Sequence, residues 1–192
     1  MRHALEVLER EGLIYRERGR GTFVQRRRVQ LDVTRLSSTA EELRARGWEP
    51  STHVLSVRRI VPRPHVQRML GLSEDQEVWE THRLRLADGE PISLQWSYVS
   101  CEIVPDLDRY DVSGSLWDTL RDAYGIELTY ADQIVRTRRA SFEEAKLLGV
   151  EEGAPVFFIE VTCYTRDGQL IEYECGAWRG DRYELYVRQR SG

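Results

Sequence analysis

The stretch from Val78 to Tyr98 restricts the fold more than any other part of the chain, because it reads as two strands joined by a tight turn. Apolar and polar residues alternate before Asp88-Gly89, and an Asp-Gly pair beside such a run is a strong hairpin signal. We therefore predict an antiparallel hairpin over residues 78–98.

The register of this hairpin decides which side chains share a face. Arg83 and Arg85 are two residues apart, so both guanidinium groups leave one face of the strand, and leucines leave the other. A strict two-residue loop places Arg83 opposite Leu94. One extra, bulged residue instead places Arg83 opposite Gln95. The same shift places Arg85 opposite Ser93. Polar side chains then lie opposite polar ones on one face and apolar side chains opposite apolar ones on the other, so we predict the bulged register.

An internal repeat links residues 66–92 to residues 143–171. Each copy has a short helix ending in Leu-Gly-hydrophobic, a strand, an Asp-Gly turn and a second strand, but only the first copy carries the paired arginines. Two such units predict a pseudo-symmetric antiparallel sheet with helices on one side, which is an α+β fold. Further predicted elements are capped helices at 38–47 and 115–125 and strands near 52–61, 126–138, 170–178 and 182–189.

The first 28 residues carry a charge opposite to that of the rest of the chain. Eight arginines and four glutamates give them a net charge of +4 within a total of −4, which leaves −8 for the remainder. This asymmetry fits a nucleic-acid-facing arm, and it equally fits a solvated arginine-rich face. The pattern predicts a helix over residues 1–11 and two strands, 13–16 and 22–24, around a Gly-Arg-Gly turn.

The segment ALEVLEREGLIYRERGRGTFV resembles the end of the winged helix-turn-helix of GntR-type transcription regulators. We therefore assign residues 1–25 to the remnant of a DNA-binding domain and residues 26–30 to a linker. Met1 falls where this family is already inside its recognition helix, so we expect the chain as given to lack normal operator affinity. The DNA-contacting residues that the resemblance implies are Arg2 and His3 on the helix and Arg16, Arg18, Gly19, Arg20 and Gly21 in the wing.

The body of the chain, residues 31–190, resembles the UTRA effector-binding domain, which has a chorismate-lyase-like fold. The motifs that carry this resemblance are RLRLADGEPI, SGSLWDTL, EEGAPVFFIE and IEYECGAWRGDRY, in this order along the chain. The resemblance implies a ligand-binding and dimerisation domain. The predicted fold is thus an α+β antiparallel sheet with helices packed on it, preceded by the winged-helix remnant.

The resemblance also implies a site for a small anionic effector over the sheet. Backbone N–H groups at Ser38, Thr39 and Ala40 would meet a phosphate or carboxylate, together with Arg83 and Arg85. The other implied residues are Ser115 as a hydroxyl donor, Glu172 as an acceptor from hydroxyls or an amine, and Gln95 and Trp178, which replace a glutamate and a tyrosine found in other members. From the residues alone, an ion-pair ladder of the two arginines with Glu80 or Glu172 is the simpler interpretation, and the flanking motifs favour ligand binding.

These observations predict a ligand-responsive DNA-binding regulator, a repressor, acting as a cytoplasmic homodimer on double-stranded operator DNA. A stand-alone metabolite sensor and a chorismate-lyase-like enzyme are the alternatives. The sequence contains no HExxH, P-loop, Ser-His-Asp order or Cys-His pairing, and its three cysteines are scattered. We predict no enzyme activity, no cofactor and no metal site. No apolar run approaches the ~20 residues that span a bilayer, so we predict no membrane contact.

Overall fold

The computed structural model describes residues 2–10, 14–17, 21–24, 28–32 and 34–188 of the chain. It combines five α-helices, one 3-10 helix and ten strands in the described residues. In chain order these are α1 (Arg2–Arg10), β1 (Ile14–Glu17), β2 (Gly21–Val24), β3 (Val29–Asp32), α2 (Thr39–Ala45), β4 (Pro50–Ile60), α3 (Pro64–Leu70), β5 (Val78–Ala87), β6 (Glu90–Ser100), η1 (Leu107–Arg109), α4 (Leu116–Tyr124), β7 (Tyr130–Arg139), α5 (Phe142–Leu148), β8 (Pro155–Tyr164), β9 (Leu170–Arg179) and β10 (Tyr183–Tyr186).

Six of these strands form one antiparallel sheet in the order β4-β5-β6-β9-β8-β7. The predicted hairpin is β5–β6, and its predicted register is confirmed: Arg83 lies opposite Gln95 and Arg85 opposite Ser93, with the bulge next to Arg85. Both turn residues, Asp88 and Gly89, have positive φ (49° and 76°), as a tight hairpin turn requires. The two repeat hairpins meet where β6 pairs with β9 at the centre of the sheet.

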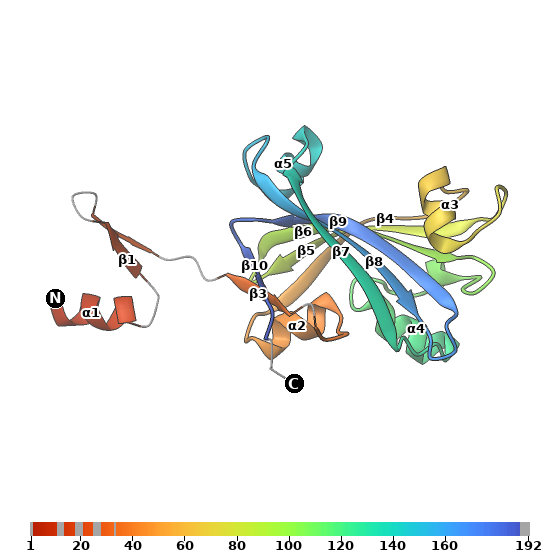
Figure 1. The fold of residues 1–192 in the computed structure, drawn as a ribbon, viewed down its shortest axis with the longest axis horizontal. Coiled ribbons are helices and arrows are strands. Elements are labelled where there is room, and N and C mark those ends of the chain that lie inside the picture. The colour runs from red at the N-terminus through yellow and green to blue at the C-terminus, as the bar shows by residue number, and fades with distance from the viewer. Residues whose placement is uncertain (1, 11–13, 18–20, 25–27, 33, 189–192) are drawn as a thin grey trace.

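The helices cover both faces of this sheet, so the prediction of helices on one side is wrong (Figure 1). The two repeat helices, α3 and α5, do share a face, where they pack on β5 and β9 through residues such as Val78 and Leu84. Helices α2 and α4 pack on the opposite face, around Ala87 and Val99. Side chains alternate between the two faces along β5. The even-numbered residues 78 and 84 therefore point to one face, and the odd-numbered residues 83 and 87 point to the other.

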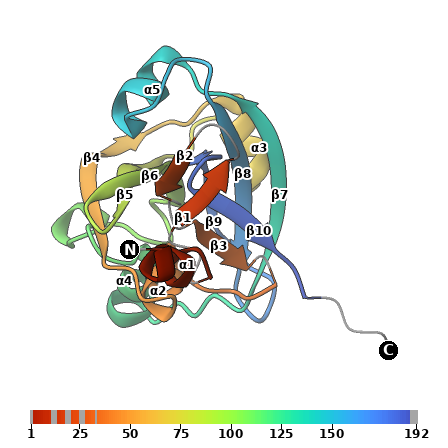
Figure 2. The ribbon, with the colours of Figure 1, turned by 90° about the vertical axis from the view of Figure 1, so that its left-hand side faces the viewer.

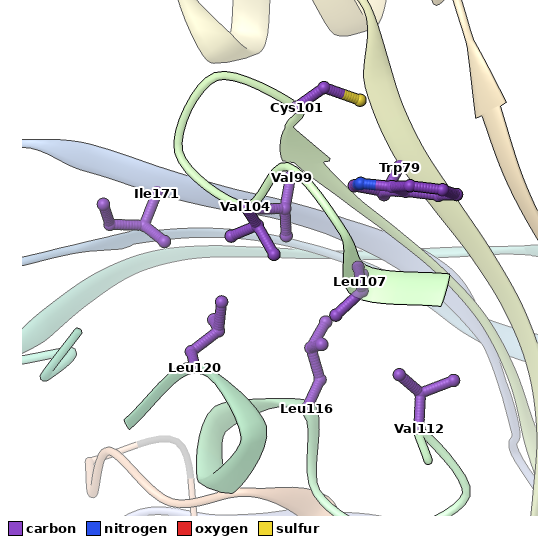
Figure 3. Packing of buried hydrophobic residues seen from close by; sticks show 9 residues of the cluster. All are labelled: Trp79, Val99, Cys101, Val104, Leu107, Val112, Leu116, Leu120 and Ile171. Atoms are coloured by element: carbon purple, nitrogen blue, oxygen red, sulfur yellow. The ribbon is translucent and has the colours of Figure 1, made fainter. Parts of the chain in front are cut away.

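Helix α4 packs on the same face of the sheet as α2, through an apolar cluster (Figure 3). Leu116 and Leu120, four residues apart on α4, point toward Val99 and Val104, and Leu120 is completely buried. Gly125 ends this helix in the left-handed conformation at φ 66°. The packing fixes the first turn of α4 above the sheet, where two of its residues enter the candidate site.

A second, two-stranded sheet lies beside the start of α2. The last strand predicted from the sequence is shorter than expected, and as β10 it pairs in parallel with β3 instead of joining the main sheet. The N–H of Val29 donates to the carbonyl of Arg182 at 2.6 Å. Because β3 follows the N-terminal segment and leads into α2, this ribbon joins the two predicted domains of the chain.

The N-terminal segment contains the predicted helix, α1, and the predicted hairpin, β1–β2, in antiparallel register from Ile14–Val24 to Glu17–Gly21. Figure 2 shows this helix and hairpin in front of the sheet. Within the described ranges, no helix combines the length and the hydropathy needed to cross a membrane.

Candidate functional site

A cavity of about 610 Å³ lies between the α2/α4 face of the sheet and the starts of these two helices. Strands β5, β7, β8 and β9 supply its floor, and residues 34–38 with Thr39, the first residue of α2, supply one wall. The sheet floor is polar because the odd-numbered residues of β5 and the even-numbered residues of β9 point into it. Seven of the nine predicted effector-site residues line this cavity: Ser38, Thr39, Arg83, Arg85, Ser115, Glu172 and Trp178.

The Arg85 side chain is buried at one end of the cavity, with a residue exposure of 5%. Its Nε donates to the Gln95 side-chain oxygen at 3.0 Å, and its Nη1 donates to Thr52 Oγ1 at 2.7 Å and to the Gly114 carbonyl at 3.0 Å. All three acceptors are neutral. Burial, followed by the nearby charge of Arg83, lowers the pKa of Arg85 to about 9. A buried guanidinium held by neutral groups is a ready partner for an anion.

Gln95 does not line the cavity but holds two groups that do. It is completely buried on β6, and its side-chain nitrogen donates to Thr39 Oγ1 at 3.2 Å while its oxygen accepts from Arg85. The amide thereby ties β5 to the first residue of α2. Ala40, the other predicted residue outside the cavity lining, is buried on α2 at 5% exposure.

Arg83 occupies the middle of the floor and has a carboxylate partner that the sequence analysis missed. Its Nη2 donates to Ser97 Oγ at 2.8 Å and lies 3.6 Å from Glu174, whose carboxylate also accepts from Ser97 at 3.1 Å. Burial and the neighbouring Glu172 raise the pKa of Glu174 to about 7, while Arg83 opposes this rise. The sequence did contain a signal, because Glu172 and Glu174 are two residues apart on one strand and must share a face.

The alternative interpretation, a ladder of surface ion pairs with Glu80 or Glu172, does not fit this face. Arg83 is 1% exposed and Arg85 is 5% exposed, and Glu80 lies on the other face of β5, where it pairs with Arg58. In the described part of the chain, Nε and Nη1 of Arg83 have no hydrogen-bond partner. Buried donors without acceptors are costly, so these atoms favour a bound polar group.

Glu172 lies at the other end of the floor and is 1% exposed. Its Oε2 accepts from the indole N–H of Trp117 at 2.7 Å, and Oε1 has no partner among the described residues. Trp117, a residue missed by the sequence analysis, comes from the first turn of α4. The preceding Ser115 uses its hydroxyl to accept from the N–H of Asp118 at 3.2 Å, so it caps α4 as well as lining the cavity.

The start of α2 differs from the prediction in one respect. Ser38 and Glu41 form a capping box, in which the Ser38 N–H donates to the Glu41 carboxylate at 2.9 Å. The Ser38 N–H is therefore already engaged. Helix geometry leaves the N–H groups of Thr39 and Ala40 without a carbonyl four residues earlier within the helix.

The predicted DNA-contacting residues are only partly described. Arg16 is exposed on β1 and lies 3.3 Å from Glu9, and Gly21 begins β2 with φ at 122°. Arg18, Gly19 and Arg20 lie outside the described residues, as do the side chains of Arg2 and His3, which begin α1. Among the described residues, no group of three or more His, Cys, Asp or Glu side chains could hold a metal ion.

Known proteins share both the sequence pattern and the fold of this chain. The family model of the UTRA domain matches residues 45–184. The HTH-type transcriptional repressor NagR of Bacillus subtilis is 31% identical over 183 residues, which cover 95% of this chain and 75% of that protein. The mannosyl-D-glycerate transport/metabolism system repressor MngR of Escherichia coli is 24% identical over 185 residues, 96% of this chain and 77% of that one. The crystal structure of PhnF from Mycobacterium smegmatis, 24% identical, covers 98% of this chain with a TM-score of 0.83, over 84% of its own length.

Proposed function

The chain belongs to the GntR-type transcription regulators that carry a UTRA domain, and we propose that it is a repressor released from operator DNA by a small anionic metabolite. The effector class is a phosphorylated sugar or a carboxylate bound in the 610 Å³ cavity. Because its relatives are named as transcription regulators and repressors, the protein is a regulator and not an enzyme.

The observation that carries the effector proposal is that the buried Arg85 guanidinium has no carboxylate among its hydrogen-bond acceptors. Its hydrogen-bond acceptors are an amide, a hydroxyl and a carbonyl, and burial lowers its pKa to about 9. A bound phosphate or carboxylate would supply a negative charge beside this buried guanidinium. Arg83 is less available to an anion, because Glu174 already lies 3.6 Å from its guanidinium.

The opposite end of the cavity suits the hydroxyl or amine groups of such a metabolite. Glu172 keeps one carboxylate oxygen without a partner in the described residues, and Trp117 fixes the other oxygen. A sugar phosphate or a sugar-linked carboxylate carries an anion at one end and donors at the other. MngR is named for a mannosyl-D-glycerate system, and mannosyl-D-glycerate has this composition.

A path from the cavity toward the N-terminal segment runs through β3. The Asp32 N–H, at the end of β3, donates to the Glu42 carboxylate on α2 at 3.2 Å, and both residues line the cavity. A ligand that changes the position of residues 34–39 would change this connection. The repressor would then shift between DNA-competent and DNA-incompetent states, with the effector binding the incompetent state more tightly.

The same proposal includes a division of the chain into a DNA-binding remnant at 1–25, a linker at 26–30 and an effector and dimerisation domain at 31–190. It also includes a cytoplasmic homodimer that binds double-stranded DNA. The exposed Arg16 on β1 and the arginines of the following turn would contact phosphates. An operator with two half-sites would then match the two-fold symmetry of the protein.

Thermal-shift measurements test the effector site. We expect glucose 6-phosphate, glucosamine 6-phosphate or glycerate to raise the melting temperature of the protein, and uncharged glucose and glycerol to leave it unchanged. Arg85→Gln should abolish the shift, and Arg121→Gln, an exposed arginine on α4, should retain it. If Arg85→Gln folds, as circular dichroism would report, and keeps the full shift, the assignment of the anion site to Arg85 is wrong.

Mobility-shift measurements test the regulatory step. The full gene product should retard DNA from upstream of its own gene, and the metabolite that gives the largest thermal shift should release that DNA. Retardation that requires the metabolite would contradict the proposed repressor role. Release that is unaffected by Arg85→Gln would show that the effector acts elsewhere.

A further inference from the structure

Two carboxylates lie side by side on the floor of the cavity. Glu172 and Glu174 are two residues apart on β9 and both line the cavity. Glu172 is 1% exposed, and the side chain of Glu174 is 16% exposed. Burial and the charge of Glu172 raise the pKa of Glu174 to about 7, in spite of the opposing charges of Arg83 and Arg85. The two arginines therefore do not offset the burial and the mutual repulsion of this acidic pair.

The neighbours of the acidic pair differ between its two sides. On the β5 side, Nη2 of Arg83 lies 3.6 Å from the Glu174 carboxylate. On the β8 side, the register places Cys163 opposite Glu172 and Val161 opposite Glu174, and both of these residues line the cavity. Burial, together with the charges of the two glutamates, raises the pKa of the Cys163 thiol, which is therefore neutral. The acidic pair thus borders the cavity beside uncharged residues of β8.

Polar atoms without partners around the cavity point to a bound polar ligand. In the part of the chain that the structure describes, Oε1 of Glu172 has no hydrogen-bond partner, and Oε2 accepts from the neutral indole N–H of Trp117. The indole N–H of Trp178, a residue only 3% exposed, also has no partner there, and neither do Nε and Nη1 of Arg83. All of these residues line the cavity. Because buried polar atoms are rarely left unpaired, a polar ligand is the simplest explanation for a group of them around one cavity.

We infer that the effector carries an ammonium group, which binds between Glu172 and Glu174, in addition to the anionic group that binds Arg85. This inference rests on the proposed function and deepens it, because it selects an amine over a hydroxyl at the glutamate end of the cavity. The ligand class is a zwitterion, either an amino-substituted phosphate or an amino-substituted carboxylate.

The charge balance of the cavity favours a zwitterion over a simple anion. The floor contributes two arginines and two glutamates, and the charged residues of the wall, Asp32, Arg35 and Glu42, add no excess of positive charge. A ligand with only an anionic group would leave excess negative charge in a buried site, which is costly. A ligand with one anion and one ammonium group leaves the balance unchanged, and each of its charges has an unlike partner on the floor.

The spacing of the two carboxylates suits an ammonium group. Residues two apart on a strand are separated by roughly 6.7 Å. An ammonium nitrogen that donates to two carboxylate oxygens at about 2.8 Å can bridge oxygens up to about 5.6 Å apart, which flexible glutamate side chains on such a strand can reach. The nitrogen has three N–H donors and can serve Glu172 and Glu174 together, whereas a hydroxyl has one donor and no charge. A hydroxyl would therefore leave one of the two carboxylates without a partner.

Titration calorimetry with matched ligands tests the ammonium site. Glucosamine 6-phosphate differs from glucose 6-phosphate, and serine from glycerate, only by an ammonium group in place of a hydroxyl. In the pair that binds the intact chain, we expect the amine to bind at least about tenfold more tightly. Equal affinities within that pair would show that the inference is wrong and would leave the anion site standing. If none of the four compounds binds, the proposed effector class itself fails.

Removal of one carboxylate assigns the preference to the acidic pair. In Glu174→Gln the preference for the amine should fall to less than about threefold, because one of the two charge-assisted hydrogen bonds is lost. Glu152→Gln removes the same charge at an exposed position before β8 and should keep the full preference. Circular dichroism reports whether each variant folds, and Glu172→Gln, with the same expected loss, replaces Glu174→Gln if the latter does not. A folded variant of the pair that keeps the full preference for the amine would overturn the assignment.

Discussion

The side-chain oxygen of Gln95 accepts a hydrogen bond from Nε of Arg85 at 3.0 Å, which leaves this buried guanidinium with a neutral partner. A carboxylate at the same position would form a charge pair with Arg85. The choice of amide over carboxylate therefore decides whether the cavity has a free positive charge at this end.

Replacing Gln95 by glutamate should remove the anion site without removing the fold. The new carboxylate would compensate Arg85 and raise its pKa from about 9 toward the usual range of arginine. We expect affinity for the charged metabolite that gives the largest thermal shift to fall at least tenfold in calorimetric titration. Gln133→Glu adds the same charge at an exposed position on β7 and should reduce affinity less. Equal losses in the two variants would mean that overall charge decides binding.

Gly176 lies opposite Gln95 in the sheet, and we expect Gly176→Ala to destabilise the protein by about 3 kcal/mol. A Cβ atom there would lie 2.3 Å from the carbonyl oxygen of Leu94 and 3.1 Å from the Trp178 ring. Urea denaturation measures the free energy of unfolding. Gly114→Ala is the control, because a Cβ atom at Gly114 has no neighbour within 4 Å. A near-neutral effect at Gly176 would mean that β6 and β9 are less tightly packed than described.

The stability of the protein should depend on pH through Glu42. Burial raises the pKa of this carboxyl to about 6, so folding favours the protonated form. The resulting stabilisation is complete below the unfolded pKa of 4.5 and is lost as the pH rises through 6. Between pH 5 and pH 8, Glu42→Gln should therefore gain stability relative to the wild type, on the order of 1 kcal/mol. Glu151→Gln, at an exposed position, should show no such trend in urea titrations at the two pH values.

Removal of the Trp117 indole N–H should destabilise the buried carboxylate at the far end of the cavity. Trp117→Phe loses the 2.7 Å hydrogen bond to Glu172, and we expect a cost of about 2 kcal/mol in the free energy of unfolding. Adding Glu172→Gln should recover part of this loss, because the unpaired charge is gone. A strictly additive double variant would show that the two side chains are not coupled. Trp96→Phe, which changes a ring stacked on His82 on the other face, is the control for loss of indole packing.

Local patterns predicted the elements that carry the site. The Asp88-Gly89 turn and the alternation around Arg83 were sufficient for the register of β5–β6, because turn chemistry and side-chain parity act over a few residues. The two-residue spacing of Glu172 and Glu174 is likewise sufficient to predict that their side chains share a face. Parity gives no information on how deeply either face is buried. The covering of the Arg83 face by α2 and α4 could therefore not be predicted from it, and surface ion pairs stayed a possible interpretation of that face.

The sequence by itself determined which residues project together from each hairpin, and the tertiary structure alone decided what they meet. Gln95 contacts Thr39 across 56 residues of chain, and Trp117 contacts Glu172 across 55. These contacts depend on β6 pairing with β9 between the two repeat hairpins, and on the docking of α2 and α4 over the joined sheet. Burial of the apolar faces of sheet and helices drives that assembly. This burial depends on segments far apart in the chain, so the local alternation of apolar and polar residues does not specify it.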